Sequence, residues 1–378
     1  MSAAHYFGIA GNSLTDGQAL RANSSLFRTA RNDTGRENTV PQYFSPTYQA
    51  TGTVLHSIVL VLGLFGNCLI ILAVVKNKYL RTPVNYHLVS LATADILVLL
   101  SSIPDTISSY FRPAHVWVLG QIGCSSLIYL QYFGINASSA SMLAFSVERY
   151  LALCRPRIIQ DPQMEISKVR LVIISIWVGV GLYCSPWIFL TQTSPLNFHD
   201  PAGEYRDAMR CHFRFLTEPL AYAMVFVSDL LLFYVVPLLI CLYLYVRMAM
   251  VVFRSIRRPS RSLQQREDQV LSSPSCDDNY ELRRHSNQNR LFSRNEYNDS
   301  DSRFRKIIQA RIQVAKMLGL VVLLFAVLSL PYRGLMVYNW FATTPWLNIW
   351  YVLFARTCIF LNSSINPLLY DLMVRAST

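Results

Sequence analysis

Long apolar stretches separated by polar segments dominate the pattern along this chain of 378 residues. A helix needs about 20 consecutive apolar residues to cross the hydrocarbon core of a membrane. Seven stretches reach that length, and they cover residues 52–75, 86–110, 124–154, 169–191, 219–249, 312–341 and 346–373. The pattern therefore predicts an all-α membrane protein built as a seven-transmembrane helix bundle.

Composition supports a membrane protein and argues against other classes. Only 15% of the residues are charged, whereas roughly 25% is usual in soluble proteins. The net charge is +12, but the basic residues cluster between the apolar stretches, so nucleic acid is not an expected partner. No cysteine pair has zinc or redox spacing and no two histidines are four residues apart, which disfavours a metalloenzyme.

Basic residues near the ends of the apolar stretches predict the orientation, because the cytosolic side carries the excess of Lys and Arg. The first and third loops hold Lys76, Lys78, Arg81, Arg155, Arg157, Lys168 and Arg170, against Arg112, Arg206, Arg210 and Arg214 on the other side. The N-terminus is therefore expected outside. It shows no basic segment followed by an apolar run, so no cleavable signal peptide is expected.

The apolar stretches and the polar segments between them divide the chain into five parts. These are an extracellular tail (1–51), helices one to five (52–249), a disordered basic cytosolic loop (250–311), helices six and seven (312–373) and a shortened cytosolic tail (374–378). Asn23 and Asn32 are the sequons on the outer side and are expected to be glycosylated. Cys124 and Cys211 both face outward, where an oxidising compartment allows them to pair.

Several polar residues interrupt the apolar stretches, where each needs a partner or a function. One group supplies oxygen atoms suited to a sodium ion or ordered waters; it comprises Asn67, Asp95, Ser138, Asn362, Ser363 and Asn366. The alternative is a hydrogen-bond network that only joins helices.

A charged triplet, Glu148-Arg149-Tyr150, ends the third stretch at the predicted cytosolic boundary. Arg149 is expected to pair with Glu148 and to release it when a partner competes, which would make a two-state latch. The alternative is simple snorkelling of the arginine to the membrane interface.

A second polar cluster is predicted in the outer half of the bundle. Tyr132 and Asn136 are four residues apart and share one helix face, and Asn136 lies about 18 Å from the outer end of its helix. Tyr332 and Arg333 follow Pro331, and Arg356 lies about 15 Å from the outer end of the last helix. Such donors would suit a small ligand rich in carbonyls and amides.

The predicted cluster contains no deep carboxylate. Gln131 occupies the position at which an acid would capture an amine, and we identify Asp105, nearer the mouth, as the only acid close by. The alternative to a ligand site is that Asp105 pairs with Arg356.

The motifs, taken together, resemble the rhodopsin-like family of G-protein-coupled receptors. They are Gly66-Asn67, Leu91-Ala92-x-Ala94-Asp95, Cys124, Glu148-Arg149-Tyr150, Trp177, Pro237, Pro331 and Asn366-Pro367-x-x-Tyr370. The segments 129–139, 330–333 and 358–367 are similar to one branch of that family, the thyrotropin-releasing hormone receptors. The resemblance covers about 52 to 373.

This resemblance implies a receptor without catalytic activity that binds pyroglutamyl-histidyl-prolineamide, or a similar amidated peptide, and couples mainly to Gq. Tyr132 and Asn136 would hold the first ring, Tyr332 the middle side chain and Arg356 the terminal amide. Asp95, Ser138, Asn362, Ser363 and Asn366 would bind an allosteric sodium ion. Glu148, Arg149, Tyr150 and Tyr370 would form the switch for the G protein.

Two departures from the family leave alternatives open. Ser329 stands where the family usually has tryptophan, and only eight residues follow Tyr370, too few for the usual amphipathic helix. A nonsignalling decoy receptor, or a receptor for another amidated neuropeptide, is compatible with these features. A seven-span transporter or channel is a remote alternative, because the sequence shows no internal repeat.

Overall fold

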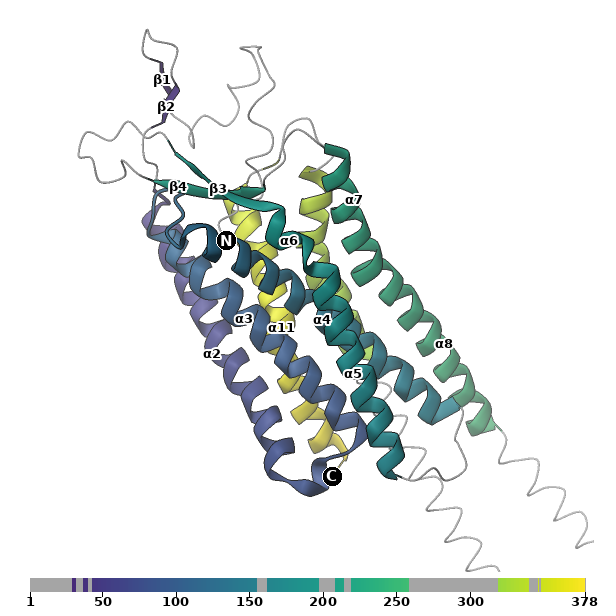
Figure 1. The fold of residues 1–378 in the computed structure, drawn as a ribbon. Coiled ribbons are helices and arrows are strands. Elements are labelled where there is room, and N and C mark those ends of the chain that lie inside the picture. The colour runs from purple at the N-terminus through teal and green to yellow at the C-terminus, as the bar shows by residue number, and fades with distance from the viewer. Residues whose placement is uncertain are drawn as a thin grey trace, which may run out of the picture.

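The computed structural model describes residues 43–154, 162–196, 208–213, 219–257, 319–339, 346 and 348–377, together with the backbone of 29–31 and 37–39. Helices run side by side through most of this chain (Figure 1). They are α2 (Pro46–Lys76), α3 (Pro83–Tyr110), α4 (Gly120–Cys154), α5 (Pro162–Cys184), α6 (Pro186–Phe189), α7 (Pro219–Leu230), the π-helix η3 (Leu231–Val235), α8 (Val236–Arg257), an unlabelled helix over Gly319–Asn339 and α11 (Ile349–Ser377). The unlabelled helix is called span six below.

The seven predicted stretches correspond to seven helical spans, so the predicted fold class is confirmed. α5 with α6 forms the fourth span, and α7, η3 and α8 together form the fifth. Five of the described spans are long and apolar enough to cross a membrane. α4 and α11 are also long, with 35 and 29 residues, but their inward faces carry the polar residues of the predicted sites.

Helix ends differ from the predicted stretches because the first turns are capped by polar residues. Ser45 Oγ accepts a hydrogen bond from the Tyr48 N–H at 3.3 Å, and Thr82 Oγ1 accepts from the Asn85 N–H at 3.4 Å. Proline follows each cap, at the position where its missing N–H costs nothing. The fifth span also extends beyond its predicted end, because α8 continues past residue 249 to Arg257.

A β-hairpin lies across one end of the bundle (Figure 1), and this end is called the hairpin end. β3 (Thr191–Pro195) pairs antiparallel with β4 (Met209–Phe213). The Cys124–Cys211 disulfide joins β4 to α4 near its N-terminal end, which confirms the predicted pairing. Two further strands, β1 (Thr29–Arg31) and β2 (Glu37–Thr39), form a separate short hairpin, and the 3-10 helix η2 (Lys78–Leu80) follows α2.

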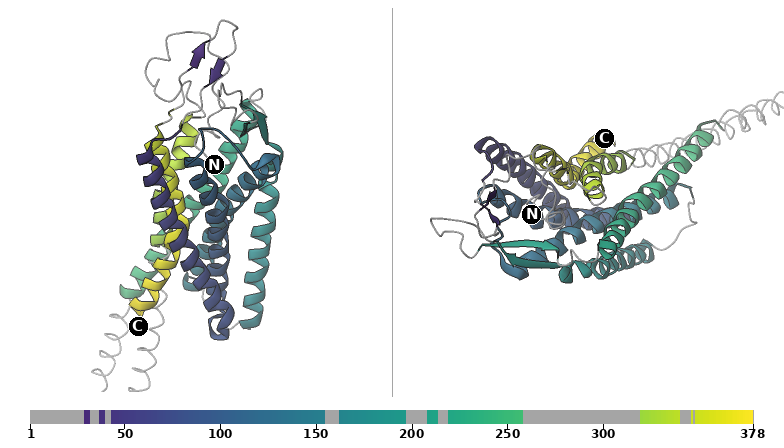
Figure 2. Two further views of the ribbon diagram at one scale, coloured as in Figure 1. Left: turned by 90° about the vertical axis from the view of Figure 1, so that its left-hand side faces the viewer. Right: turned by 90° about the horizontal axis from the view of Figure 1, so that it is seen from above.

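Close helix packing positions the polar residues in the interior. A Cβ atom added to Gly134 of α4 would lie 2.7 Å from Val98 Cγ2 of α3, and one added to Gly66 of α2 would lie 2.7 Å from Pro367 of α11. Only glycine permits these approaches. Figure 2 shows α2 and α11 lying side by side, and Asn67 of α2 donates to the Ser363 carbonyl oxygen of α11 at 2.9 Å.

Several predictions concern residues outside the described part of the chain. The predicted glycosylation sites Asn23 and Asn32 lie there, as does most of the predicted loop 250–311. The side chain of Tyr370 is also outside the described residues, although its backbone belongs to α11.

Candidate binding site

A buried ion pair joins the fifth span to span six. Arg333 Nη1 lies 3.3 Å from Asp229 Oδ2, and Asn136 Nδ2 of α4 donates to Asp229 Oδ1 at 2.6 Å. Asp229 is 5% exposed, Arg333 8% and Asn136 0%. Burial weakens the competition from water, so this carboxylate is held by two charge-assisted contacts from two helices.

Asp229 corrects the sequence analysis, which predicted no deep carboxylate in this region. The signal was present, because Asp229 is the only acidic residue in the apolar stretch 219–249. A charge at such a position is expensive and marks a functional site. Its partner could not be read from the sequence, since Arg333 lies 104 residues away.

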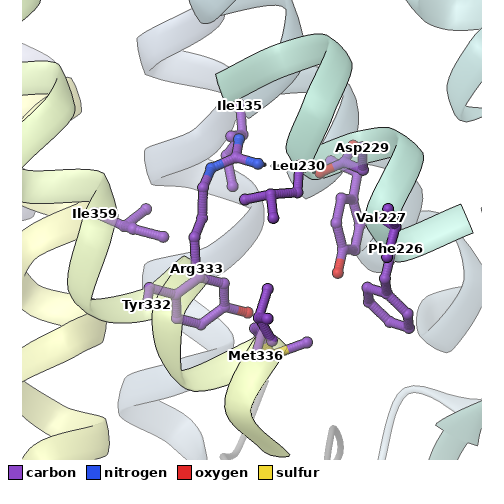
Figure 3. A pocket seen from close by; sticks show the side chains of 11 residues that line it. Ile135, Phe226, Val227, Asp229, Leu230, Tyr332, Arg333, Met336 and Ile359 are labelled. Carbon is purple, nitrogen blue, oxygen red and sulfur yellow. Dashed lines mark hydrogen bonds and ion pairs between the residues drawn. The ribbon is translucent and has the colours of Figure 1, made fainter. Parts of the chain in front are cut away.

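The ion pair forms part of the wall of a cavity of about 590 Å³, a volume that includes its open mouth. Figure 3 shows Arg333 and Tyr332 projecting from span six toward the helix that carries Asp229. The wall is completed mainly by apolar side chains, among them Ile135, Phe226 and Met336. Of the predicted ligand-binding residues, Tyr132, Tyr332 and Arg333 line this cavity.

Tyr132 is fixed in place from the hairpin end. Its ring stacks on Trp187 of α6 with the ring centroids 4.1 Å apart and an interplanar angle of 9°. Trp187 is 1% exposed and packs against Phe213 of β4, which belongs to the hairpin. The disulfide-linked hairpin thus positions one wall of the cavity.

A smaller cavity adjoins the first; its volume of about 240 Å³ also includes open solvent, and Tyr332 and Ile359 border both cavities. Its polar lining comes from Ser102, Thr106, Gln131 and Arg356. Arg356 is only 7% exposed, and among the described residues its guanidinium has no hydrogen-bond or ion-pair partner. Asp105 forms its ion pair with Arg112, at 3.1 Å, so the alternative pairing of Asp105 with Arg356 is not what the structure shows.

Three polar atoms around the two cavities have no hydrogen-bond partner in the described part of the chain. They are Gln131 Oε1, Asn136 Oδ1 and Arg333 Nη2. A buried polar atom without a partner costs about 1–3 kcal/mol. Two acceptors and one donor are therefore left for a bound molecule or for water.

The network around Asp95 brings four of its five predicted members together. Asp95 is 0% exposed and accepts hydrogen bonds from Asn366 Nδ2 at 2.7 Å and from Ser138 Oγ at 3.1 Å. Ser363 lies against the same carboxylate. Asn362, the fifth predicted member, is half-buried and no contact with Asp95 is seen. These bonds join α3 to α4 and α11 through the Asp95 carboxylate, and a sodium ion at this network stays a prediction.

At the end opposite the hairpin, Arg149 forms the predicted ion pair with Glu148 through Nε and Nη2. The Arg149 guanidinium carbon also lies 5.9 Å from the centroid of the Phe145 ring. Tyr150, the next residue in the sequence, is half-buried. Ser329, at the position where the family usually has tryptophan, is 5% exposed in span six.

Comparison with known proteins agrees with this arrangement. The family model of the 7 transmembrane receptor (rhodopsin family) matches residues 66–370. The thyrotropin-releasing hormone receptor of Homo sapiens is 37% identical over 327 residues, which is 86% of this chain and 75% of that receptor. The Gallus gallus receptor of the same name is 35% identical over 91% of this chain and 80% of its own length. The trissin receptor of Drosophila melanogaster is 29% identical over 59% of this chain and 32% of its own.

Proposed function

Because the chain belongs to the rhodopsin family of seven-transmembrane receptors, we propose that it is a receptor for a short amidated peptide that signals mainly through Gq-class G proteins. Membership makes it a multi-pass protein of the plasma membrane and a receptor, not an enzyme. The ligand class follows from the relatives, which are named thyrotropin-releasing hormone receptors.

The observation that best supports a peptide amide is the charge distribution over the two adjoining cavities. The larger cavity holds one acid and one base, Asp229 and Arg333, which neutralise each other. Among the described residues that line the smaller cavity, Arg356 is the charged one and none is an acid. A ligand with a neutral, partly apolar body and an electron-rich carbonyl at one end matches this distribution, because the carbonyl can accept from Arg356.

In this proposal each predicted residue has a defined role. Tyr132 packs against the first ring of the peptide, and Tyr332, between the cavities, contacts the middle side chain. Arg356 and Gln131 bind the terminal amide. Asn136 uses its Nδ2 to hold Asp229, so its Oδ1 is the atom available to the ring N–H, and Arg333 Nη2 is available to a ring carbonyl.

At the opposite end, Arg149 is the proposed contact for the G protein once it leaves Glu148. Orientation with the N-terminus outside places this end in the cytosol and the hairpin end toward the ligand. The group around Asp95, Ser138 and Asn366 would hold a sodium ion, whose charge would stabilise the carboxylate in the inactive state. A ligand that binds the active arrangement more tightly shifts the population toward it.

Calcium mobilisation in cells expressing the chain tests this proposal. Cells are challenged with pyroglutamyl-histidyl-prolineamide, its free-acid form and a panel of other amidated tripeptides. Arg356→Gln is compared with Tyr338→Phe, a matched control on the exposed face of span six. We expect a response to the amide that Arg356→Gln weakens and Tyr338→Phe leaves unchanged.

Two other outcomes point to the alternatives. Binding of the amide at the cell surface without a calcium, cyclic nucleotide or arrestin response would support a decoy receptor. A response to another panel member alone would reassign the ligand. Silence toward every peptide, with surface expression verified by an N-terminal epitope tag, would refute the proposed ligand class.

A further inference from the structure

We propose that Tyr234 clamps span six to the fifth span on both sides of Pro331, and that the ligand cavity controls the movement of span six through this tyrosine. The inference rests on the proposed function, in which ligand binding moves span six. It assigns a positioning role to a residue that does not line either cavity.

Two contacts of Tyr234 define the clamp. Its hydroxyl donates to the Ala326 carbonyl oxygen at 2.9 Å, and its ring centroid lies 5.3 Å from the guanidinium carbon of Arg333. Ala326 precedes Pro331 by five residues and Arg333 follows it by two. One side chain, 8% exposed, therefore holds span six before and after its proline.

Pro331 makes this part of span six a natural hinge. Proline has no N–H, so the carbonyl of Val327 loses its usual partner within the helix, and the ring strains the turn before it. Kinks in helices concentrate at such positions. Contacts that bridge the proline from another helix restrain bending there, and Tyr234 supplies two of them.

Arg333 connects the ligand cavity to Tyr234, because it lines the cavity and also contacts the Tyr234 ring. Its guanidinium is shared between Asp229 Oδ2 and the Tyr234 ring, while Nη2 has no partner among the described residues. Both Asp229 and Arg333 line the cavity (Figure 3). A ligand carbonyl that accepts from Nη2 must draw the guanidinium toward itself, which weakens its contact with Tyr234.

The segment that carries Tyr234 is anchored from behind. Tyr234 lies in the π-helix η3, and π-turns of this kind are frequent at functional sites. Ser139 Oγ of α4 donates to the Phe233 carbonyl oxygen of η3 at 2.6 Å. Because α4 holds η3 at the neighbouring residue, a loosened clamp leaves span six as the element free to move.

Distance measurements between spin labels test the clamp without any ligand. The full chain is placed in lipid nanodiscs with nitroxides on Leu171→Cys of α5 and Leu320→Cys of span six, both exposed positions near the end opposite the hairpin. Cys68, Cys154 and Cys276 are replaced by serine in the parent, and pulsed electron paramagnetic resonance measures the distance distribution.

Tyr234→Phe removes the hydroxyl and keeps the ring, and Asp229→Asn releases the guanidinium while keeping the shape of the side chain. Loss of one hydrogen bond should raise the ratio of the long-distance to the short-distance population about two- to ten-fold. Tyr183→Phe is the matched control: its hydroxyl bonds to Ser228 Oγ at 2.8 Å, beside the ion pair, and makes no bond to span six.

We expect a larger long-distance population in Tyr234→Phe and Asp229→Asn and an unchanged distribution in Tyr183→Phe. A parent-like distribution in Tyr234→Phe would overturn the clamp whatever Asp229→Asn shows, because the ion pair itself joins the two spans. If Tyr234→Phe does not fold, Tyr234→Leu takes its place in the same comparison. A shift of equal size in the Tyr183→Phe control would also overturn the clamp. If pyroglutamyl-histidyl-prolineamide leaves the distance distribution of the parent unchanged, that result contradicts the proposed ligand and not the clamp, because the variants are compared without ligand.

Discussion

Replacing Asp229 by alanine should destabilise the folded receptor, because it leaves a buried guanidinium without its counter-ion. The carboxylate accepts from Arg333 at 3.3 Å and from Asn136 at 2.6 Å, and the side chains of the ion pair are 8% and 9% exposed. Removing one partner of a buried pair costs about 3–5 kcal/mol. Asn136 Nδ2 would keep only its weak contact with Cys184 Sγ at 3.6 Å.

A double variant separates this effect from loss of packing. Asp229→Leu with Arg333→Leu removes both charges together, and replacing a buried pair by apolar residues is often neutral. The double variant should therefore recover most of the stability that Asp229→Ala loses. A cost of 3–5 kcal/mol corresponds to a fall in melting temperature on the order of 10 °C.

The buried thiols provide the assay. Cys184 and Cys241 are 0% exposed, so a dye that fluoresces on reacting with thiols reports unfolding of the purified protein as it is heated. We expect a large fall in melting temperature for Asp229→Ala and for Arg333→Ala, with recovery in the Leu–Leu double variant. Equal melting temperatures in the parent and both single variants would refute the reasoning, as would additive losses in the double variant.

Four further predictions concern separate parts of the molecule. Arg356→Gln should weaken binding of a radiolabelled peptide amide about ten- to hundred-fold, the value of a charged hydrogen bond of about 1.5–3 kcal/mol, and an unchanged affinity would remove Arg356 from the site. Asp95→Asn should abolish any effect of sodium on agonist affinity, measured against a choline chloride control; a persisting sodium effect would place the ion elsewhere. Ser329→Trp should change ligand-free inositol phosphate production, and an identical basal signal at equal surface expression would show that this position does not couple to activation. Cys211→Ser, which opens a disulfide spanning 87 residues, should cost about 2–5 kcal/mol and lower surface expression, whereas normal expression and binding would make the hairpin tether dispensable.

The spans were predictable because each is an apolar run far longer than a strand or an ordinary core helix. Their ends were not, because capping residues such as Ser45 and Thr82 are polar and lie outside the runs. The Cys124–Cys211 and Glu148–Arg149 pairs were predictable from topology and adjacency. Such pairs need no knowledge of how the helices rotate.

Contacts between distant spans were harder to predict, because the sequence does not give the rotation of one helix against another. Asp229 was visible as an isolated acid, but its pairing with Arg333 and Asn136 depends on the facing of three helices. Pairing of Asp105 with Arg356 was the alternative to a ligand site, but Asp105 pairs with Arg112 just beyond the end of α3. Neither the hydrophobic pattern nor the family motifs single out Tyr234 or the π-helix that carries it.

The shared wall between the two cavities bears on how compounds for this receptor can be assembled. Tyr332 and Ile359 border both spaces, so fragments designed for the two spaces would lie against the same side chains. Joining such fragments by a short linker converts the second binding event into an intramolecular one, with an effective concentration in the millimolar range. An uncharged aromatic fragment for the larger space and a carbonyl-rich fragment for the smaller one therefore form a rational starting pair, and the tether between them must pass around the tyrosine.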